Sequence, residues 1–182
     1  MKLYYRALNY YVRICSMEIF KFGSDVLRTP TQSILQVTDE IRDLLDDMIE
    51  TMILAPGIGL AAPQVGHELR MFVMNTEEGQ FHKIINPVIL QAEGISTFNE
   101  GCLSFPELFA DIVRPEWIKV KFLNEDGEEV EMERDGLWSR CFQHELDHLD
   151  GRLMVDHLTH KQLRKLREEL EQIEKLGSEQ NG

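Results

Sequence analysis

The segment from Asp135 to Gly151 constrains the fold of the 182-residue chain more than any other. Its apolar residues recur with the 3.6-residue period of an α-helix, and His144 and His148 follow the same period. Asp135 is a candidate N-cap, and Gly151 is a candidate C′ residue just past the last turn. The periodic apolar residues are Leu137, Trp138, Cys141, Phe142 and Leu149. The sequence therefore predicts a buried helix on which the other elements pack.

A second helix is predicted over Asp39–Leu54, where apolar residues also recur at helical spacing. Thr38 is a candidate N-cap, and acidic residues occupy the first turn. The helix must end near Pro56 and Gly57, because proline cannot continue a helix and glycine favours a turn. This segment is predicted to be amphipathic and to pack on a core.

A third helix is predicted to begin at Thr159, which forms a capping-box pattern with Gln162. Its periodic apolar residues are Leu163, Leu166, Leu170 and Ile173. We expect the tail, residues 177–182, to fray.

The region between the first two helices has the pattern of short β-strands. Ile118–Phe122 alternates between apolar and polar residues, and Asn124–Gly127 then forms a turn signal that leads into Val130 and Met132. Other β-rich runs are Leu69–Met74, Phe81–Ile85 and Val88–Leu90. These elements predict an α+β fold, with antiparallel strands packed around the central helix, an N-terminal amphipathic helix and a C-terminal helix. The chain has no repeat or linker, so a single domain is expected over residues 17–176.

Composition excludes several classes of protein. With 19 Lys and Arg against 32 Asp and Glu, the formal charge is -13, which argues against a broad nucleic-acid-binding surface and so against DNA as a partner. No apolar stretch approaches the roughly 18 residues of a membrane span, so no membrane partner is expected. The three cysteines are too few and too scattered for a disulfide framework, which favours a reducing compartment.

Residues 1–16 are basic and contain no acidic residue, but they lack the apolar run and cleavage site of a secretory signal. They fit either a weak organellar targeting peptide or an extension upstream of a second start at Met17. We favour an extension of uncertain role.

The strongest chemical signal is the sequence His144-Glu-Leu-Asp-His148. Histidines four residues apart lie on one face of a helix and can bind one cation. The carboxylate of Glu145 then lies close enough to act as a general base without being a ligand. The alternative is that all three are ordinary surface residues of a helix. The apolar neighbours in this segment favour a metal, because buried ionisable groups need a partner.

A catalytic metal site usually has three protein ligands and an open position, so a third ligand is required. A peptidase of the His-Glu-x-x-His class would take it from downstream, where Asp156, His157 and His160 are candidates. Cys102, in a short turn between β-rich segments, offers a soft thiolate instead. The residues alone leave both alternatives open.

A third motif, Gly57-Ile-Gly-Leu-Ala-Ala-Pro-Gln64, follows the first helix. Taken with Glu100-Gly-Cys-Leu-Ser104 and His144-Glu-Leu-Asp-His148, in this order, it resembles the peptide deformylases, which remove the formyl group from the initiator methionine of new bacterial chains. The similarity extends from about Met17 to Leu176.

The resemblance implies a ferrous ion, with zinc, nickel or cobalt as substitutes, bound by Cys102, His144 and His148. It implies Glu145 as the general acid and base. It further implies that the side-chain amide of Gln64 and the backbone N–H of Leu103 stabilise the oxyanion. The backbone of Ile58 and Gly59 is implied to pair with an extended N-formylmethionyl peptide in a bacterial cytoplasm.

Some features lie outside the family pattern. Pro56 and the pair Leu108-Phe109 stand where many members carry other residues, an arginine that contacts substrate in the second case. Arg114 is expected to be a structural ion-pair partner. The apolar pocket for methionine is expected to draw on Ile58, Leu108, Phe109 or Phe142.

The last helix carries basic residues in its first half and acidic residues in its second, which opposes the helix dipole. The basic residues are Lys161, Arg164, Lys165 and Arg167. We hypothesise that this basic face docks on the ribosome; a solvated helix surface is the alternative.

Two other functions compete with a deformylase. A zinc endopeptidase would use the same helix without Cys102. A structural or metal-sensing module would bind the ion without hydrolysis and would not need the carboxylate of Glu145.

Overall fold

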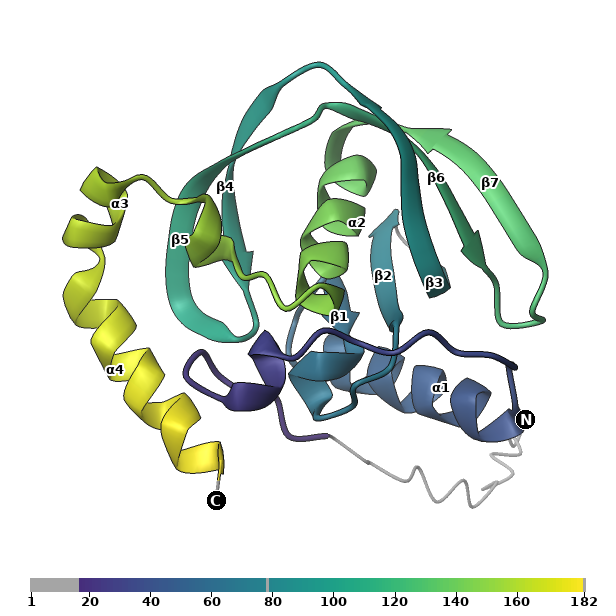
Figure 1. The fold of residues 1–182 in the computed structure, drawn as a ribbon, viewed down its shortest axis with the longest axis horizontal. Coiled ribbons are helices and arrows are strands. Elements are labelled where there is room, and N and C mark those ends of the chain that lie inside the picture. Colours follow the sequence, from purple (N-terminus) through teal and green to yellow (C-terminus); the bar gives the residue numbers. More distant parts are fainter. Residues whose placement is uncertain (1–16, 78, 182) are drawn as a thin grey trace, which may run out of the picture.

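The computed structural model describes residues 17–77 and 79–181, so the expectations for residues 1–16 lie outside the described residues. Figure 1 shows the helix α2, Gly136–Leu149, in the centre, with a sheet on one side and a separate hairpin on the other. This is the α+β arrangement predicted from the sequence, with antiparallel strands around a central helix.

The larger sheet has the strand order β1-β2-β3-β6-β7, and every neighbouring pair is antiparallel. Its strands are β1 Gly59–Ala61, β2 Met71–Glu77, β3 Gln80–Glu93, β6 Trp117–Leu123 and β7 Glu129–Arg134. The predicted hairpin is present as β6 and β7, in which Ile118 pairs with Arg134 and Leu123 with Glu129.

Strand β3 is a single 14-residue strand where two short runs were expected. Its register against β6 shifts between Ile85 and Val88, and Asn86 has a positive φ of 51°. Proline at position 87 cannot donate to the ladder, so the strand is interrupted by a bulge and then continues. The two predicted runs are the two halves of one bent strand.

β-rich segments were expected on both sides of Cys102, but their strands were not delimited from the sequence, and they form a second, two-stranded sheet. It consists of β4 Ser96–Cys102 and β5 Phe105–Arg114. Strand β4 is largely polar, and the exposed positions of β5 carry apolar Phe109 and Val113, so neither strand shows a clean alternation. This hairpin places Cys102 opposite α2.

Helix α2 spans Gly136–Leu149, as its period predicted, and Gly151 adopts a positive φ of 69° just past its end. One face packs on the larger sheet, where Phe142 meets Phe72 edge to face at 5.2 Å. Helix α1, Asp39–Leu54, covers another part of the same sheet through Leu45, Met48 and Met52, which are almost completely buried. Both helices follow the predicted boundaries.

The predicted C-terminal helix is divided into α3, His160–Lys165, and α4, Arg167–Ser178. Leu166 interrupts it with ψ 9°, which lets leucines of both halves pack on the cluster around Leu27 and Ile112. The capping box of Thr159 and Gln162 is confirmed. The expected conflict with the helix dipole is wrong, since basic residues end α3 and acidic residues begin α4.

The tail contradicts the expectation that it frays. The side chain of Gln180 accepts a hydrogen bond from the backbone N–H of Lys21 at 2.7 Å, and Asn181 accepts one from the N–H of Asp25 at 2.8 Å. Gly177 is buried against the carbonyl groups of Lys21 and Phe22, where a Cβ atom would not fit. Residues 177–181 are therefore attached to the N-terminal segment.

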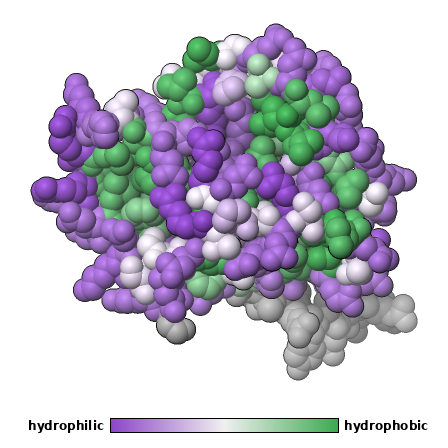
Figure 2. Space-filling view, in the orientation of Figure 1, coloured by the Kyte–Doolittle hydropathy of each residue, from purple (hydrophilic) through white to green (hydrophobic). Residues whose placement is uncertain are grey.

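Within residues 17–77 and 79–181, four short 3-10 helices complete the fold: η1 Asp25–Arg28, η2 Ala62–Val65, η3 Met154–His157 and η4 Glu179–Asn181. None of the helices in the described part of the chain is long and apolar enough to cross a membrane. Figure 2 shows that the face of the molecule seen in Figure 1 is mostly hydrophilic, with hydrophobic side chains in separate groups.

Candidate metal centre

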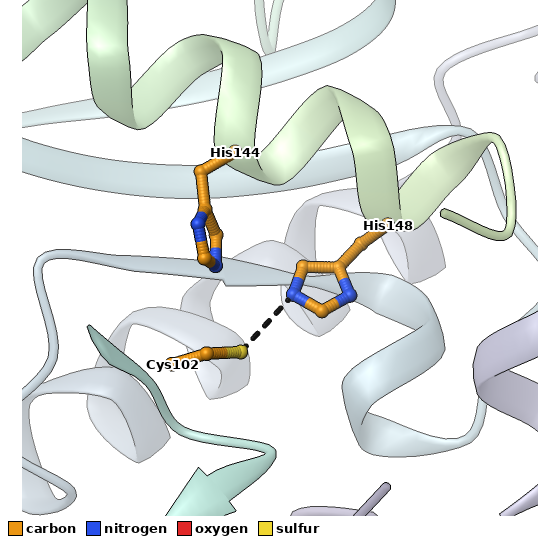
Figure 3. Close-up of side chains that lie close together, drawn as sticks. All are labelled: Cys102, His144 and His148. Carbon is orange, nitrogen blue, oxygen red and sulfur yellow. Dashed lines mark hydrogen bonds between the residues drawn. The ribbon is translucent and has the colours of Figure 1, made fainter. Parts of the chain in front are cut away.

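Cys102, His144 and His148 lie together although they come from two elements. Cys102 is the last residue of β4, and the two histidines lie one turn apart on α2 (Figure 3). One ligand atom from each residue lies within 4.8 Å of the other two. Sγ of Cys102 is 3.3 Å from Nε2 of His148. The helix and the hairpin thus present three donors to one point, as a metal site with an open position requires.

The side chains fit a divalent ion. Nδ1 of His144 lies 2.9 Å from the carboxylate of Glu100, which leaves its Nε2 for a metal. Nδ1 of His148 is buried and has no hydrogen-bond partner among the described residues. A thiolate and two imidazoles form a donor set that suits iron, zinc, cobalt or nickel.

The downstream candidates for the third ligand lie elsewhere. The carboxylate of Asp156 pairs with Arg28, and Nε2 of His157 is 2.7 Å from the carboxylate of Asp147. His160 is exposed at the start of α3. Of the alternatives left open by the sequence, the structure brings only Cys102 to the two histidines.

The surroundings of Cys102 favour its thiolate. Burial raises the pKa of this thiol, but the charges and hydrogen bonds of His148 and His144 outweigh burial and hold the pKa well below its usual range. A thiolate is the form that binds a metal ion.

Glu100 is a candidate supporting residue of the site to which the sequence analysis gave no role. It is 5% exposed and accepts hydrogen bonds from Nε of Arg114 at 2.8 Å and from Arg140, besides contacting His144. Burial raises the pKa of Glu100, but His144 and Arg114 lower this pKa by a larger amount, so the net shift is strongly downward. An ionised Glu100 therefore fixes the ring orientation of His144. The sequence feature that could have pointed to Glu100 is its position two residues before the candidate ligand Cys102.

Arg114 forms the ion pairs expected of it. Besides Glu100, it contacts Asp147 at 2.7 Å, and Asp147 in turn contacts His157. Burial raises the pKa of Asp147, but His157 and Arg114 lower it to about 2. Beside the candidate ligands, one continuous chain of paired groups therefore links Arg140, Glu100, Arg114, Asp147 and His157.

The carboxylate of Glu145 lies beside the candidate ligands and is 3% exposed. Its Oε2 is buried without a hydrogen-bond partner among the described residues. Burial is the main cause that raises its pKa to about 7. A carboxyl group with a pKa near neutrality is suited to both accepting and donating a proton.

Gly59, in the edge strand β1, lies directly against Glu145. A Cβ atom at this position would meet the Glu145 carboxylate and the sulfur of Cys141. Glycine is therefore required here for close packing. The neighbouring carbonyl of Ile58 accepts a hydrogen bond from the N–H of Asn75 at 2.8 Å.

Gln64 and Leu103 approach the cluster from two different segments. Oε1 of Gln64 accepts a hydrogen bond from the N–H of Ala61 at 2.8 Å, which turns its Nε2 toward Cys102 at 3.5 Å and Ser104 at 3.2 Å. Leu103 follows Cys102 in the turn between β4 and β5. Both donors implied by the family resemblance are thus close to the candidate metal ligands.

A pocket of about 510 Å³ opens beside these groups. Its apolar wall includes Ile58, Leu108, Phe109 and Leu137. Phe142, also named as a pocket candidate, lies in the core on the other side of α2. The pocket therefore combines an apolar wall with the candidate ligands and Glu145.

Comparisons with known proteins identify the family of this chain. A family model described as polypeptide deformylase matches residues 16–164. A peptide deformylase of Alkalilimnicola ehrlichii is 44% identical over 164 residues, covering 88% of this chain and 92% of the relative. One from Phenylobacterium zucineum is 45% identical over 147 residues, covering 78% of this chain and 87% of the relative.

Solved structures show the same likeness. The crystal structure of peptide deformylase from Thermus thermophilus superimposes with a TM-score of 0.84 at 37% identity. The superposition covers 88% of this chain and 99% of that one.

Proposed function

This chain belongs to the polypeptide deformylase family, and from that premise we propose which of its residues perform the reaction. The protein is a metal-dependent hydrolase that removes the N-formyl group from the initiator methionine of newly made polypeptides and releases formate. The proposal rests on one observation above all: three potential ligand atoms lie within 4.8 Å of one another. They adjoin a buried carboxylate with a raised pKa.

In this proposal Cys102, His144 and His148 hold one divalent ion. We propose Fe²⁺ as the native ion, with Zn²⁺, Ni²⁺ or Co²⁺ able to replace it, because the donor set suits all four. Such an ion would act as a Lewis acid toward water and the formyl oxygen. Glu100 holds His144 in the orientation that presents its free nitrogen.

Glu145 carries the proton. It accepts a proton from the attacking water as the C–O bond to the formyl carbon forms, and donates it to the peptide nitrogen as the C–N bond breaks. Formate and a free amino terminus result. The burial that raises the pKa of Glu145 makes both transfers feasible near neutral pH.

The amide of Gln64 and the N–H of Leu103 stabilise the oxyanion. Gln64 is buried, and its hydrogen bond to Ala61 fixes which end of the amide faces the site. Donors held in place before the reaction lose no energy to reorganisation, which is the source of their effect.

Methionine occupies the apolar part of the pocket, and the peptide runs along β1. In this proposal the backbone of Ile58 and Gly59 pairs with the peptide as with an added strand, and the position of β1 at the edge of the larger sheet supports it. Leu108 and Phe109 offer apolar contacts to the peptide.

The remaining parts of the proposal concern the whole chain. We assign residues 17–176 to one catalytic domain and the reaction to the bacterial cytoplasm. The ribosome is proposed as a partner through Lys161, Arg164 and Lys165, which are exposed on α3 of a chain with a formal charge of -13.

The test is formate release from formyl-Met-Ala-Ser by protein purified anaerobically with ferrous iron. Glu145→Gln should abolish release while metal content stays at the wild-type level, because the amide cannot carry the proton. Glu169→Gln, an exposed residue on α4, is the matched control and should behave as wild type. Undiminished release by Glu145→Gln would refute the proposed role of this residue, and no release by metal-loaded wild type would refute the assignment of the site.

A further inference from the structure

The two proposed oxyanion donors come from segments that are far apart in the sequence, so something must hold them in register. Gln64 lies in η2, whereas Leu103 lies in the turn of the β4–β5 hairpin. A third segment, Phe20–Phe22, contacts both. The N–H of Phe20 donates to the carbonyl of Gln64 at 2.8 Å, and the N–H of Phe22 donates to the carbonyl of Ser104 at 3.0 Å.

The turn that carries Leu103 lacks the backbone geometry that two-residue hairpins favour. Leu103 and Ser104 are its two central residues, between the paired Cys102 and Phe105. Two-residue hairpins favour turns with positive φ at the first central residue, because these match the twist of the strands. Among the described non-glycine residues only Pro56, Asn86 and Glu107 have positive φ, so Leu103 does not form such a turn.

The peptide between the two central residues is the part of a turn that flips between turn types. Here the peptide group between Leu103 and Ser104 is contacted by the side chain of Lys21, which belongs to another segment. Nζ of Lys21 donates to the carbonyl oxygen of Leu103 at 3.0 Å. The N–H of Leu103 makes no hydrogen bond to another residue in the described part of the chain, so this donor is left free for a ligand.

Lys21 is also placed in the pocket wall. It lines the same pocket as Gln64, Cys102 and Glu145, and it is half-buried. Burial lowers the pKa of its ammonium group, against the opposing charges of Cys102 and Glu18. The ammonium is therefore partly removed from water and directed at a carbonyl, which strengthens this hydrogen bond.

We propose that Lys21 is a positioning residue of the oxyanion site, which holds the Leu103–Ser104 peptide so that the Leu103 N–H stays directed at the reacting carbonyl. The inference rests on the proposed function, in which Leu103 is an oxyanion donor. Lys21 acts through Leu103 and does not itself transfer a proton.

The test compares the steady-state kinetics of formate release for wild type, Lys21→Met and Lys21→Arg. Methionine is unbranched and one atom shorter than lysine and has no donor, whereas arginine keeps a charged donor. Lys21→Met should lower kcat about tenfold with little change in KM. The reason is that the negative charge on the formyl oxygen develops only in the transition state, so binding of the substrate is hardly affected. This loss is smaller than the roughly 100-fold or more that follows removal of an oxyanion donor itself. Lys21→Arg should recover most of kcat.

The matched control is Lys121→Met, a lysine on β6 that pairs with Glu129 away from the pocket, and it should behave as wild type. A Lys21→Met variant with unchanged kcat would overturn the inference, and so would a rise in KM alone, which would make Lys21 a peptide-binding residue. Activity of the wild type in the same assay separates these results from a failure of the proposed function.

A structural readout protects the test against general loss of folding. In zinc-loaded protein labelled with ¹⁵N-leucine, Lys21→Met should shift the Leu103 amide resonance while most other leucine resonances stay in place. An unchanged Leu103 resonance would contradict the inference, as would shifts of all leucine resonances together.

Discussion

The central helix α2 and the C-terminal pair α3 and α4 both carry many charged residues, but they use them differently. On α2, Arg140, Glu145 and His148 are all less than 7% exposed. Helix α3 has no buried residue, and on α4 only Ile173 and Gly177 are buried. Charges that are buried must be compensated, so those of α2 form a defined chemical site. Those of the C-terminal pair remain in water and contribute little to stability.

The largest expected difference concerns Glu100, which compensates the buried cations beside α2. Glu100→Gln should lower the free energy of unfolding by roughly 3 to 5 kcal/mol, because it leaves Arg114 and Arg140 without their shared carboxylate. It should also weaken metal binding by about 10- to 100-fold, since His144 loses its partner. Urea unfolding and metal titration measure the two effects.

The control for Glu100 is Glu131→Gln, which removes an exposed partner of Lys119 on the larger sheet. It should change the free energy of unfolding by less than about 1 kcal/mol. Equal effects of the two substitutions would remove the distinction between buried and exposed charges.

A smaller effect is expected at Asp156, which pairs with Arg28 just before α3 and is 34% exposed. Burial raises the pKa of Asp156, but Arg28 and the N–H of Leu153 lower it, so the net shift is downward. The stability that this carboxylate contributes is present above the unfolded-state pKa and is lost as the pH falls through the lower folded-state value. Asp156→Asn should therefore cost up to about 1 kcal/mol at pH 7.

Urea unfolding at several pH values checks this prediction. The difference between wild type and Asp156→Asn should shrink as the solution is made more acidic than the ordinary aspartate range. A difference that grows in acid would show that the ion pair with Arg28 is not its source.

The smallest effect on the enzyme itself is expected for the exposed basic residues of α3. Reversing the charges of Lys161, Arg164 and Lys165 should change the free energy of unfolding by less than about 0.5 kcal/mol. Formate release from a short peptide should stay at the wild-type level. If α3 docks on the ribosome, co-sedimentation with ribosomes should fall, and unchanged co-sedimentation would refute this docking.

Regular elements with a clear period could be predicted from the sequence. The boundaries of α1 and the hairpin β6–β7 follow from hydrophobic spacing and turn residues, and the capping box of Thr159 follows from local chemistry. The break between α3 and α4 at Leu166 could not be predicted from the sequence, because it is determined by the packing of leucines on the cluster around Leu27. Tertiary contacts outweighed the local period here.

The candidate ligands could be predicted because each lies in a compact motif. Arg114 was expected to form an ion pair, but the partners of the supporting residues could not be predicted. Arg114 and Arg140 lie 14 and 40 residues from Glu100 in the sequence, and nothing local links them. The same holds for Lys21, which reaches Leu103 across 82 residues. The chemistry is local in the sequence, but the contacts that orient it exist only in the fold.

The central claim is that Cys102, together with His144 and His148, holds a metal ion. We would load the protein with Co²⁺, which suits this donor set, and record its absorption spectrum for wild type, Cys102→Ser and Cys141→Ser. Wild type and Cys141→Ser should show an intense thiolate-to-metal charge-transfer band with one ion per chain, and Cys102→Ser should lose the band. A band that survives in Cys102→Ser, or that disappears only in Cys141→Ser, would contradict the account.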